Sequence, residues 1–69
     1  MNLKRLDYIK KHGMKNAIIS EFYKESEMQG NNIYETQAEL IKSEFVKPRM
    51  LSDYTRTYEK NRNTIDWVK

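Results

Sequence analysis

Few side chains in this sequence belong to the types that perform catalysis or hold metal ions. His12 is the single histidine among 69 residues, and the chain has no cysteine. Nucleophilic catalysis would have to pair His12 with a serine, and no carboxylate is evidently placed to orient the imidazole ring. A structural zinc site typically takes four Cys or His ligands, so the ligand count excludes a zinc finger.

Two pairs of acidic side chains are four residues apart, Glu21 with Glu25 and Glu35 with Glu39. On a helix this spacing places both carboxylates on one face, where they could share a proton or bind a cation. Exposed pairs of like charge are also ordinary, slightly destabilising features of helix surfaces. The chain has neither a phosphate-binding glycine loop nor a calcium loop. We therefore predict a protein that is not an enzyme and takes no cofactor and no small-molecule substrate.

Length and composition define the class of protein. The 69 residues form one domain at most, taken as 1–69. A chain of this size buries only about 60 % of the surface that its unfolded form exposes, so its stability should be marginal. The longest apolar run is Ala17-Ile18-Ile19, far below the roughly 18 residues of a membrane span, and no stretch resembles a signal peptide. We expect a cytoplasmic protein without membrane contact. The abundance of residues with AT-rich codons hints at a low-GC bacterium or its phages and plasmids.

The distribution of helix-breaking residues predicts an all-α fold. Only two glycines and one proline interrupt the sequence, and β-branched runs are few. We expect a compact single domain of three or four helices, with short turns at Gly13, Gly30–Asn32 and Pro48. The helices should cover about residues 2–12, 15–29 and 33–46, followed by a fourth from Arg49 or Ser52 to the end. Asn32 is the expected N-cap of the third helix.

Apolar spacing indicates which side chains should form the core. In the second helix the expected buried residues are Ile18, Ile19 and Phe22. The third helix has the cleanest apolar stripe, formed by Tyr34, Ala38, Ile41 and Phe45 and flanked by Leu40. In the fourth helix, apolar residues recur at heptad-like intervals up to an interruption at Asn61-Arg62-Asn63.

The stretch IKKHGMKNAI, residues 9–18, fits two interpretations. Gly13 could be the turn of a DNA-binding helix-turn-helix, or it could end one helix before another begins. Ile9 stands where close helix approach needs a small residue, and Glu25 would lie near the DNA phosphates. A DNA-binding regulator is therefore the alternative interpretation, with a reading helix that begins at Lys15. Its nucleic-acid contacts would come from Lys10, Lys11, Lys15, Asn16, Ser20 and Lys24.

The charge pattern and the aromatic content favour binding to another protein. The net charge of +3 divides into basic ends, residues 1–15 and 47–69, and an acidic middle, residues 16–46. The chain also has five Tyr, one Trp and four Met, types that are enriched in interface cores. We predict a regulator, inhibitor or accessory subunit of the kind that mobile elements encode, whose partner is a protein, including a second copy as a homodimer.

The residues predicted to bind this partner are exposed aromatic and basic side chains of the fourth helix. They are Arg49, Arg56, Tyr58, Lys60, Arg62 and Trp67. The spacing leaves a second interpretation open for part of this set. Tyr54 and Tyr58 lie on the apolar stripe, which is typical of core residues, while Arg56 and Lys60 form a separate basic row.

Overall fold

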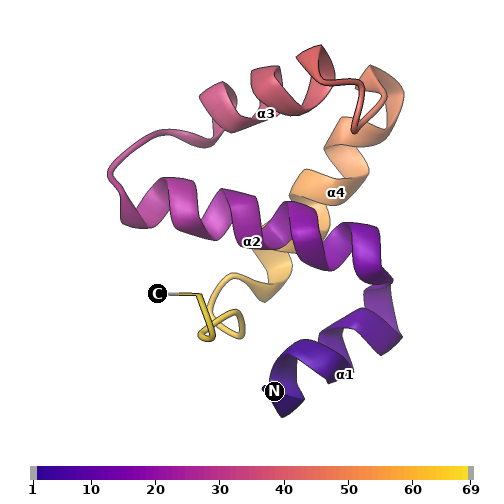
Figure 1. Ribbon diagram of the computed structural model, residues 1–69, viewed down its shortest axis with the longest axis vertical. Helices are drawn as coiled ribbons and strands as arrows, with labels where there is room; N and C mark the ends of the chain where they lie inside the picture. Colours follow the sequence, from indigo (N-terminus) through magenta and orange to yellow (C-terminus); the bar gives the residue numbers. More distant parts are fainter. Residues whose placement is uncertain (1, 69) are drawn as a thin grey trace.

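The computed structural model describes residues 2–68, which form four α-helices and no β-strand (Figure 1). The helices are α1 (Leu3–His12), α2 (Met14–Met28), α3 (Ile33–Lys42) and α4 (Pro48–Asn61). The prediction of a small all-α fold is confirmed, in its four-helix form. Within residues 2–68, no helix combines the length and the apolar composition needed to cross a membrane.

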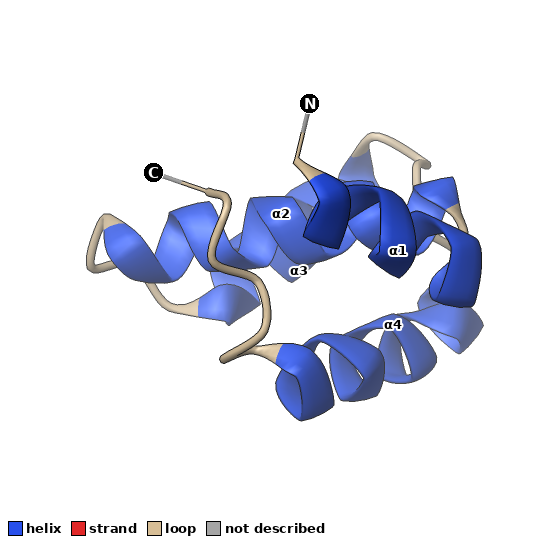
Figure 2. Cartoon of the chain, turned by 90° about the horizontal axis from the view of Figure 1, so that it is seen from below, coloured by secondary structure: helices blue, strands red, loops and turns tan. Residues whose placement is uncertain are grey.

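The longest helix, α2, is the centre of the fold. It packs against α1, α3 and α4, whereas these three make few contacts with one another. Figure 2 shows α1 and α4 on different sides of α2, with the segment after α4 returning past α2 toward the N-terminal end. The core is therefore organised around α2, and the other helices contribute to it through their contacts with α2.

The core is rich in tyrosine, and each buried tyrosine hydroxyl has a hydrogen-bond partner. The Tyr8 hydroxyl lies 2.9 Å from the Ser20 hydroxyl, and the Tyr23 hydroxyl lies 3.1 Å from that of Thr55. Tyr58 donates to the Glu27 carboxylate. A buried polar group costs free energy unless it is paired, so these bonds allow the rings to be buried. The buried apolar residues are Tyr8, Ala17, Ile19, Tyr23, Leu40, Val46, Tyr58 and Ile65.

Glycine ends the first two helices, as predicted. Gly13 has φ 96° and ψ 157°, a conformation that is essentially restricted to glycine, and its N–H donates to the Ile9 carbonyl at 2.7 Å. Gly30 follows α2 at φ 84°. The predicted N-cap of α3 is also confirmed, because Asn32 Oδ1 accepts a hydrogen bond from the Glu35 N–H at 3.2 Å.

The third helix is shorter than predicted. It ends at Lys42, not at residue 46, because Glu44 adopts a left-handed conformation with φ 62°. The Glu44 N–H donates to the Ile41 carbonyl at 3.0 Å, and the Phe45 N–H donates to the Leu40 carbonyl at 3.0 Å. This is the Schellman arrangement, which normally has glycine at the left-handed position. The glutamate at this position concealed the end of the helix from the sequence analysis.

The fourth helix begins within one residue of the predicted Arg49, but it ends earlier than predicted. It begins at Pro48, which occupies the first turn, where proline is favoured. It ends at Asn61, so the predicted continuation to the C-terminus is wrong. The segment that follows, residues 62–68, folds back onto α1 and α2, and Ile65 in this segment is completely buried. The interruption at Asn61-Arg62-Asn63 is therefore the end of the helix.

The predicted buried faces of α2 and α3 are only partly correct. Ile19 is buried, but Phe22 is 46 % exposed. In α3 the buried residue is Leu40, whereas Tyr34 of the predicted stripe is 73 % exposed. The reason is that α3 packs mainly against a single neighbour, α2. Leu40 is buried, Ile41 and Phe45 at the end of the predicted stripe are half-buried, and only its first half, which includes Tyr34, is exposed.

Candidate interaction surfaces

The residues predicted to bind a protein partner divide into two groups in the structure. Arg49, Arg56 and Lys60 are exposed on α4, and within residues 2–68 none of them takes part in an ion pair. Tyr58 is 1 % exposed and belongs to the core, and Trp67 is half-buried and packed against the core. The interpretation of Tyr58 as a core residue of the apolar stripe is therefore confirmed, whereas the exposure expected of Tyr58 and Trp67 as partner-binding residues is wrong.

The C-terminal segment is held by two glutamates of α2. Glu21 Oε2 accepts hydrogen bonds from the Trp67 indole N–H at 2.6 Å and from Arg5 Nε at 2.7 Å. Glu27 accepts from the Arg62 guanidinium and from the Tyr58 hydroxyl. Both the charge of Arg62 and the indole N–H of Trp67 are thus used within the molecule.

The surroundings of these groups change their pKa values. Burial, the largest single influence, raises the pKa of Glu21, but the hydrogen bonds from Arg5 and Trp67 and the charge of Arg5 together outweigh it. The pKa of Glu21 therefore lies below its ordinary value. Burial and the nearby charge of Glu59 raise the pKa of Tyr58. Glu21 is thus ionised and Tyr58 neutral at physiological pH, as their hydrogen bonds require.

The residues predicted to contact DNA also divide between the surface and the interior. Ser20 is fully buried against Tyr8, so its predicted outward orientation is wrong. Asn16 Nδ2 donates back to the His12 carbonyl at 3.0 Å, and Lys24 Nζ donates to the Arg62 carbonyl at 3.3 Å. The face of α2 that would have to enter a DNA groove is therefore covered by other parts of the chain.

The remaining lysines of this set stay at the surface. Lys10, Lys11 and Lys15 are exposed, and Lys11 forms an ion pair with Asp7 at 3.3 Å. Lys15 Nζ lies 5.1 Å from the centre of the Phe45 ring, a cation–π contact. Lys10 and Lys11 lie in the last turn of α1 and Lys15 in the first turn of α2, so all three surround the Gly13 turn at the surface.

The structure does not gather the few residues that could do chemistry. His12 is half-buried, and the centre of its ring lies 4.5 Å from that of Tyr8. In the acidic pair of α2, Glu21 accepts a hydrogen bond from Arg5, whereas Glu25 accepts one from Gln29 at 3.4 Å. Within residues 2–68, no group of three or more His, Cys, Asp or Glu side chains could hold a metal ion.

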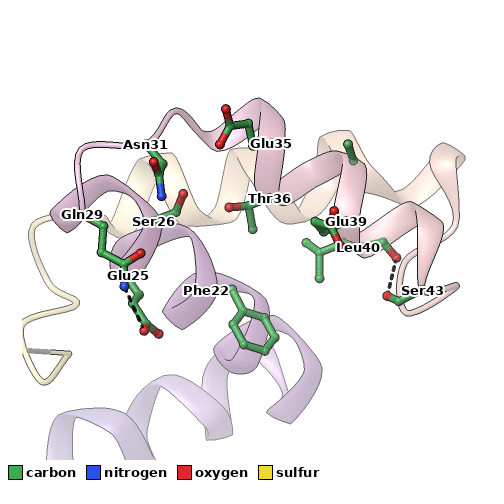
Figure 3. Close-up of a pocket in the computed structure, with 11 residues that line it drawn as sticks. Phe22, Glu25, Ser26, Gln29, Asn31, Glu35, Thr36, Glu39, Leu40 and Ser43 are labelled. Atoms are coloured by element: carbon green, nitrogen blue, oxygen red, sulfur yellow. Dashed lines mark hydrogen bonds between the residues drawn. The ribbon is translucent and has the colours of Figure 1, made fainter.

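A groove with a volume of about 780 Å³ lies between α2 and α3 (Figure 3). Its lining includes Phe22 from α2 and Thr36, Ala38 and Leu40 from α3. Phe22 is 46 % exposed, whereas Phe45, the other phenylalanine, is half-buried and packs against the buried core cluster. The turn after α2 closes one end of the groove, where Gln29 and Asn31 lie.

Carboxylates from both helices line this groove. Glu25 belongs to α2, and Glu35 and Glu39 belong to α3. None of the ion pairs formed within residues 2–68 includes them. The groove was not predicted from the sequence, because the spacing of Phe22 was taken as a sign of burial. The available signal was the acidic middle block, which contains all three glutamates.

Comparison of this chain with protein-family models, with curated proteins and with solved structures found no match.

Proposed function

We propose that this protein acts by binding another protein, without catalysing a reaction, and that the groove between α2 and α3 is its docking site. It would work as a regulator or accessory subunit of that partner. The observation that supports this proposal is the position of Phe22, which lies on the wall of the groove with 46 % of its surface exposed.

An aromatic side chain in this position has free energy to contribute to binding. Completely burying a phenylalanine side chain stabilises by roughly 1.5–3 kcal/mol relative to leaving it in water. A partner that covers Phe22 would gain the share of this free energy that belongs to the surface still exposed after folding. Residues that dominate interface energies are commonly aromatic and lie in pockets from which water is excluded. Phe22, with Leu40 and Thr36 opposite it, has this setting once the groove is filled.

The basic row of α4, which the sequence analysis favoured, has a weaker claim. Arg49, Arg56 and Lys60 are exposed, and Asp53 and Glu59 are exposed on the same helix. Exposed charge pairs typically contribute about 0–1 kcal/mol, and they affect the rate and selectivity of association more than its strength. We therefore assign the main binding energy to the groove and treat the basic row as a surface to be compared with it.

Selection of peptide ligands from a random display library tests this proposal directly. We expect ligands selected on the wild-type protein to bind at least tenfold more weakly to a Phe22→Ala variant, measured by fluorescence anisotropy. The matched control is Tyr34→Ala, which shortens an even more exposed aromatic side chain outside the groove. This control should change the affinity less than twofold.

A second variant separates the two surfaces. Replacing Arg49, Arg56 and Lys60 by glutamine should leave the selected ligands bound. If this triple variant loses them while Phe22→Ala retains them, the docking site lies on α4 and the groove is not involved. Circular dichroism of each variant verifies that the helices remain folded.

A further inference from the structure

We infer that the occupant of the groove is an α-helix of the partner protein, with an apolar stripe flanked on both sides by lysine or arginine. This inference rests on the proposed function and adds the chemistry of the partner to it. It follows from the shape of the groove, from the apolar side chains on its walls and from the distribution of negative charge.

The shape favours a helix. The walls are two helices that run in opposite directions on either side of the turn at residues 29–32 (Figure 3). A third helix can pack its ridge of side chains into the space between two such helices. The shorter wall, α3, has 10 residues, which at about 1.5 Å per residue corresponds to almost three helical turns. Two or three apolar side chains of a partner helix, at spacings of three and four residues, would therefore fit along it.

The charge distribution favours basic flanks. The groove has Glu25 on one wall and Glu35 and Glu39 on the other. The other two glutamates of α2, Glu21 and Glu27, are already bonded to arginines of the chain. A helix with acidic flanks would meet like charge on both walls, whereas lysine or arginine would find a carboxylate on each side.

A second copy of this chain is a poorer match for the groove than a separate partner. Its exposed cations on α4 share that helix with Asp53 and Glu59, and Lys11 on α1 is paired with Asp7. On both helices, acidic side chains therefore stand among the basic ones. A partner helix with uninterrupted basic flanks therefore complements the groove better than the chain complements itself.

Three synthetic helical peptides with an identical leucine stripe test the inference. One carries lysine, one glutamine and one glutamate on both flanks, and each is titrated into ¹⁵N-labelled protein. We expect the lysine peptide to shift the amide signals of Phe22, Thr36 and Leu40 and to saturate. The glutamine peptide should bind about tenfold more weakly, because several exposed charge pairs together contribute about that factor, and the glutamate peptide should bind most weakly.

Matched variants of the protein locate the charge effect. A triple variant, Glu25→Gln with Glu35→Gln and Glu39→Gln, should bind the lysine peptide about tenfold more weakly. The control changes the net charge equally outside the groove. It is the triple variant Glu44→Gln, Asp53→Asn and Glu59→Gln, and its affinity should stay within twofold of the wild type.

Three results would overturn the inference. One is equal binding of the three peptides or preference for the glutamate peptide. Another is that none of the three peptides shifts the amide signals of the groove residues. That result would not decide the proposed docking function, which is tested separately by the selection from the display library. The third is self-association of the protein that Phe22→Ala abolishes, measured by analytical ultracentrifugation, because the occupant would then be a second copy.

Discussion

On the side of α2 that faces α1 and the C-terminal segment, the glutamates are fully engaged. Glu21 holds Arg5 and Trp67, and Glu27 holds Arg62 and Tyr58. On the side that faces α3, Glu25 has only Gln29 as a hydrogen-bond partner, and Phe22 stands half-exposed beside it. Residues of the same types, on one helix, thus stabilise the fold on one side and remain available on the other.

The difference arises from how much of the chain returns to each side. The part of α2 that carries Glu21 and Glu27, here called the first side, meets three separate segments, α1, α4 and residues 62–68, which supply the partners of these two glutamates. The second side meets α3, in which Leu40 is the single buried residue. We conclude that the first side serves stability and that the second is the one open to binding. Three changes test this division, from the largest expected effect to the smallest.

Removing the buried apolar anchor of the C-terminal segment should have the largest effect. Ile65 is completely buried, so Ile65→Ala should lower the free energy of unfolding by about 2–5 kcal/mol, because it leaves a cavity in the core. Urea unfolding followed by circular dichroism measures the loss. Fluorescence of Trp67, the single tryptophan, reports whether the segment detaches first.

The matched control for this change is Ile41→Ala, which shortens a half-buried isoleucine of α3. If the two sides of α2 differ as described, the loss for Ile41→Ala should be clearly smaller than that for Ile65→Ala. Equal losses would show that the α3 side is as important for stability as the side of the C-terminal segment.

Neutralising one glutamate on each side compares the sides directly. Glu21→Gln weakens partly buried, charge-assisted bonds to Arg5 and Trp67 and should lower the free energy of unfolding by about 1–2 kcal/mol. Glu25→Gln, on the same helix, should change it by less than about 0.5 kcal/mol. Chemical denaturation at pH 7 measures both values, and similar values for the two variants would contradict the comparison.

The pH dependence sharpens this test. The pKa of Glu21 in the folded protein lies below its ordinary value of 4.5. Its contribution to stability is therefore complete above that ordinary value and is lost as the pH falls through the lower folded value. The difference in stability between wild type and Glu21→Gln should thus shrink on acidification. A difference that stays constant or grows as the pH falls would show that the charge of Glu21 is not the cause.

Relieving the backbone at the end of α3 should have the smallest effect, and it should be favourable. Glu44 has φ 62°, a conformation that costs a residue other than glycine roughly 1 kcal/mol. Glu44→Gly should therefore raise the free energy of unfolding by up to about 1 kcal/mol. Thermal unfolding measures the gain. Glu44→Ala removes the same carboxylate without relieving the backbone, so a gain in that variant would point to the charge.

Local signals explain what could be predicted from the sequence. The glycines at 13 and 30, the cap at Asn32 and the proline at 48 each act within a few residues. The ends of α1 and α2 and the beginnings of α3 and α4 were therefore predictable. The ends of α3 and α4 were not, because Glu44 is an unusual residue for its conformation and because Asn61 carries no strong stop signal.

The location of the candidate site depended on longer-range information. Spacing placed Phe22, Tyr34 and Tyr58 on apolar stripes, and Trp67 was expected to be exposed together with the basic residues of its segment. Spacing describes the faces of one helix at a time. It does not reveal how many neighbours cover each face, and this number reversed the expected burial of Phe22 and Tyr34 and the expected exposure of Trp67.

The amino-acid sequence by itself determined the all-α class, the positions of the main turns and the scarcity of catalytic side chains. These depend on residue types and on interactions over three or four positions, which the sequence displays directly. Only the tertiary structure decided that residues 62–68 return to Glu21 and Glu27 while Phe22 and Glu25 remain uncovered. The physical reason is that burial depends on which distant segments meet, and the single central helix α2 has more surface than its three neighbours cover.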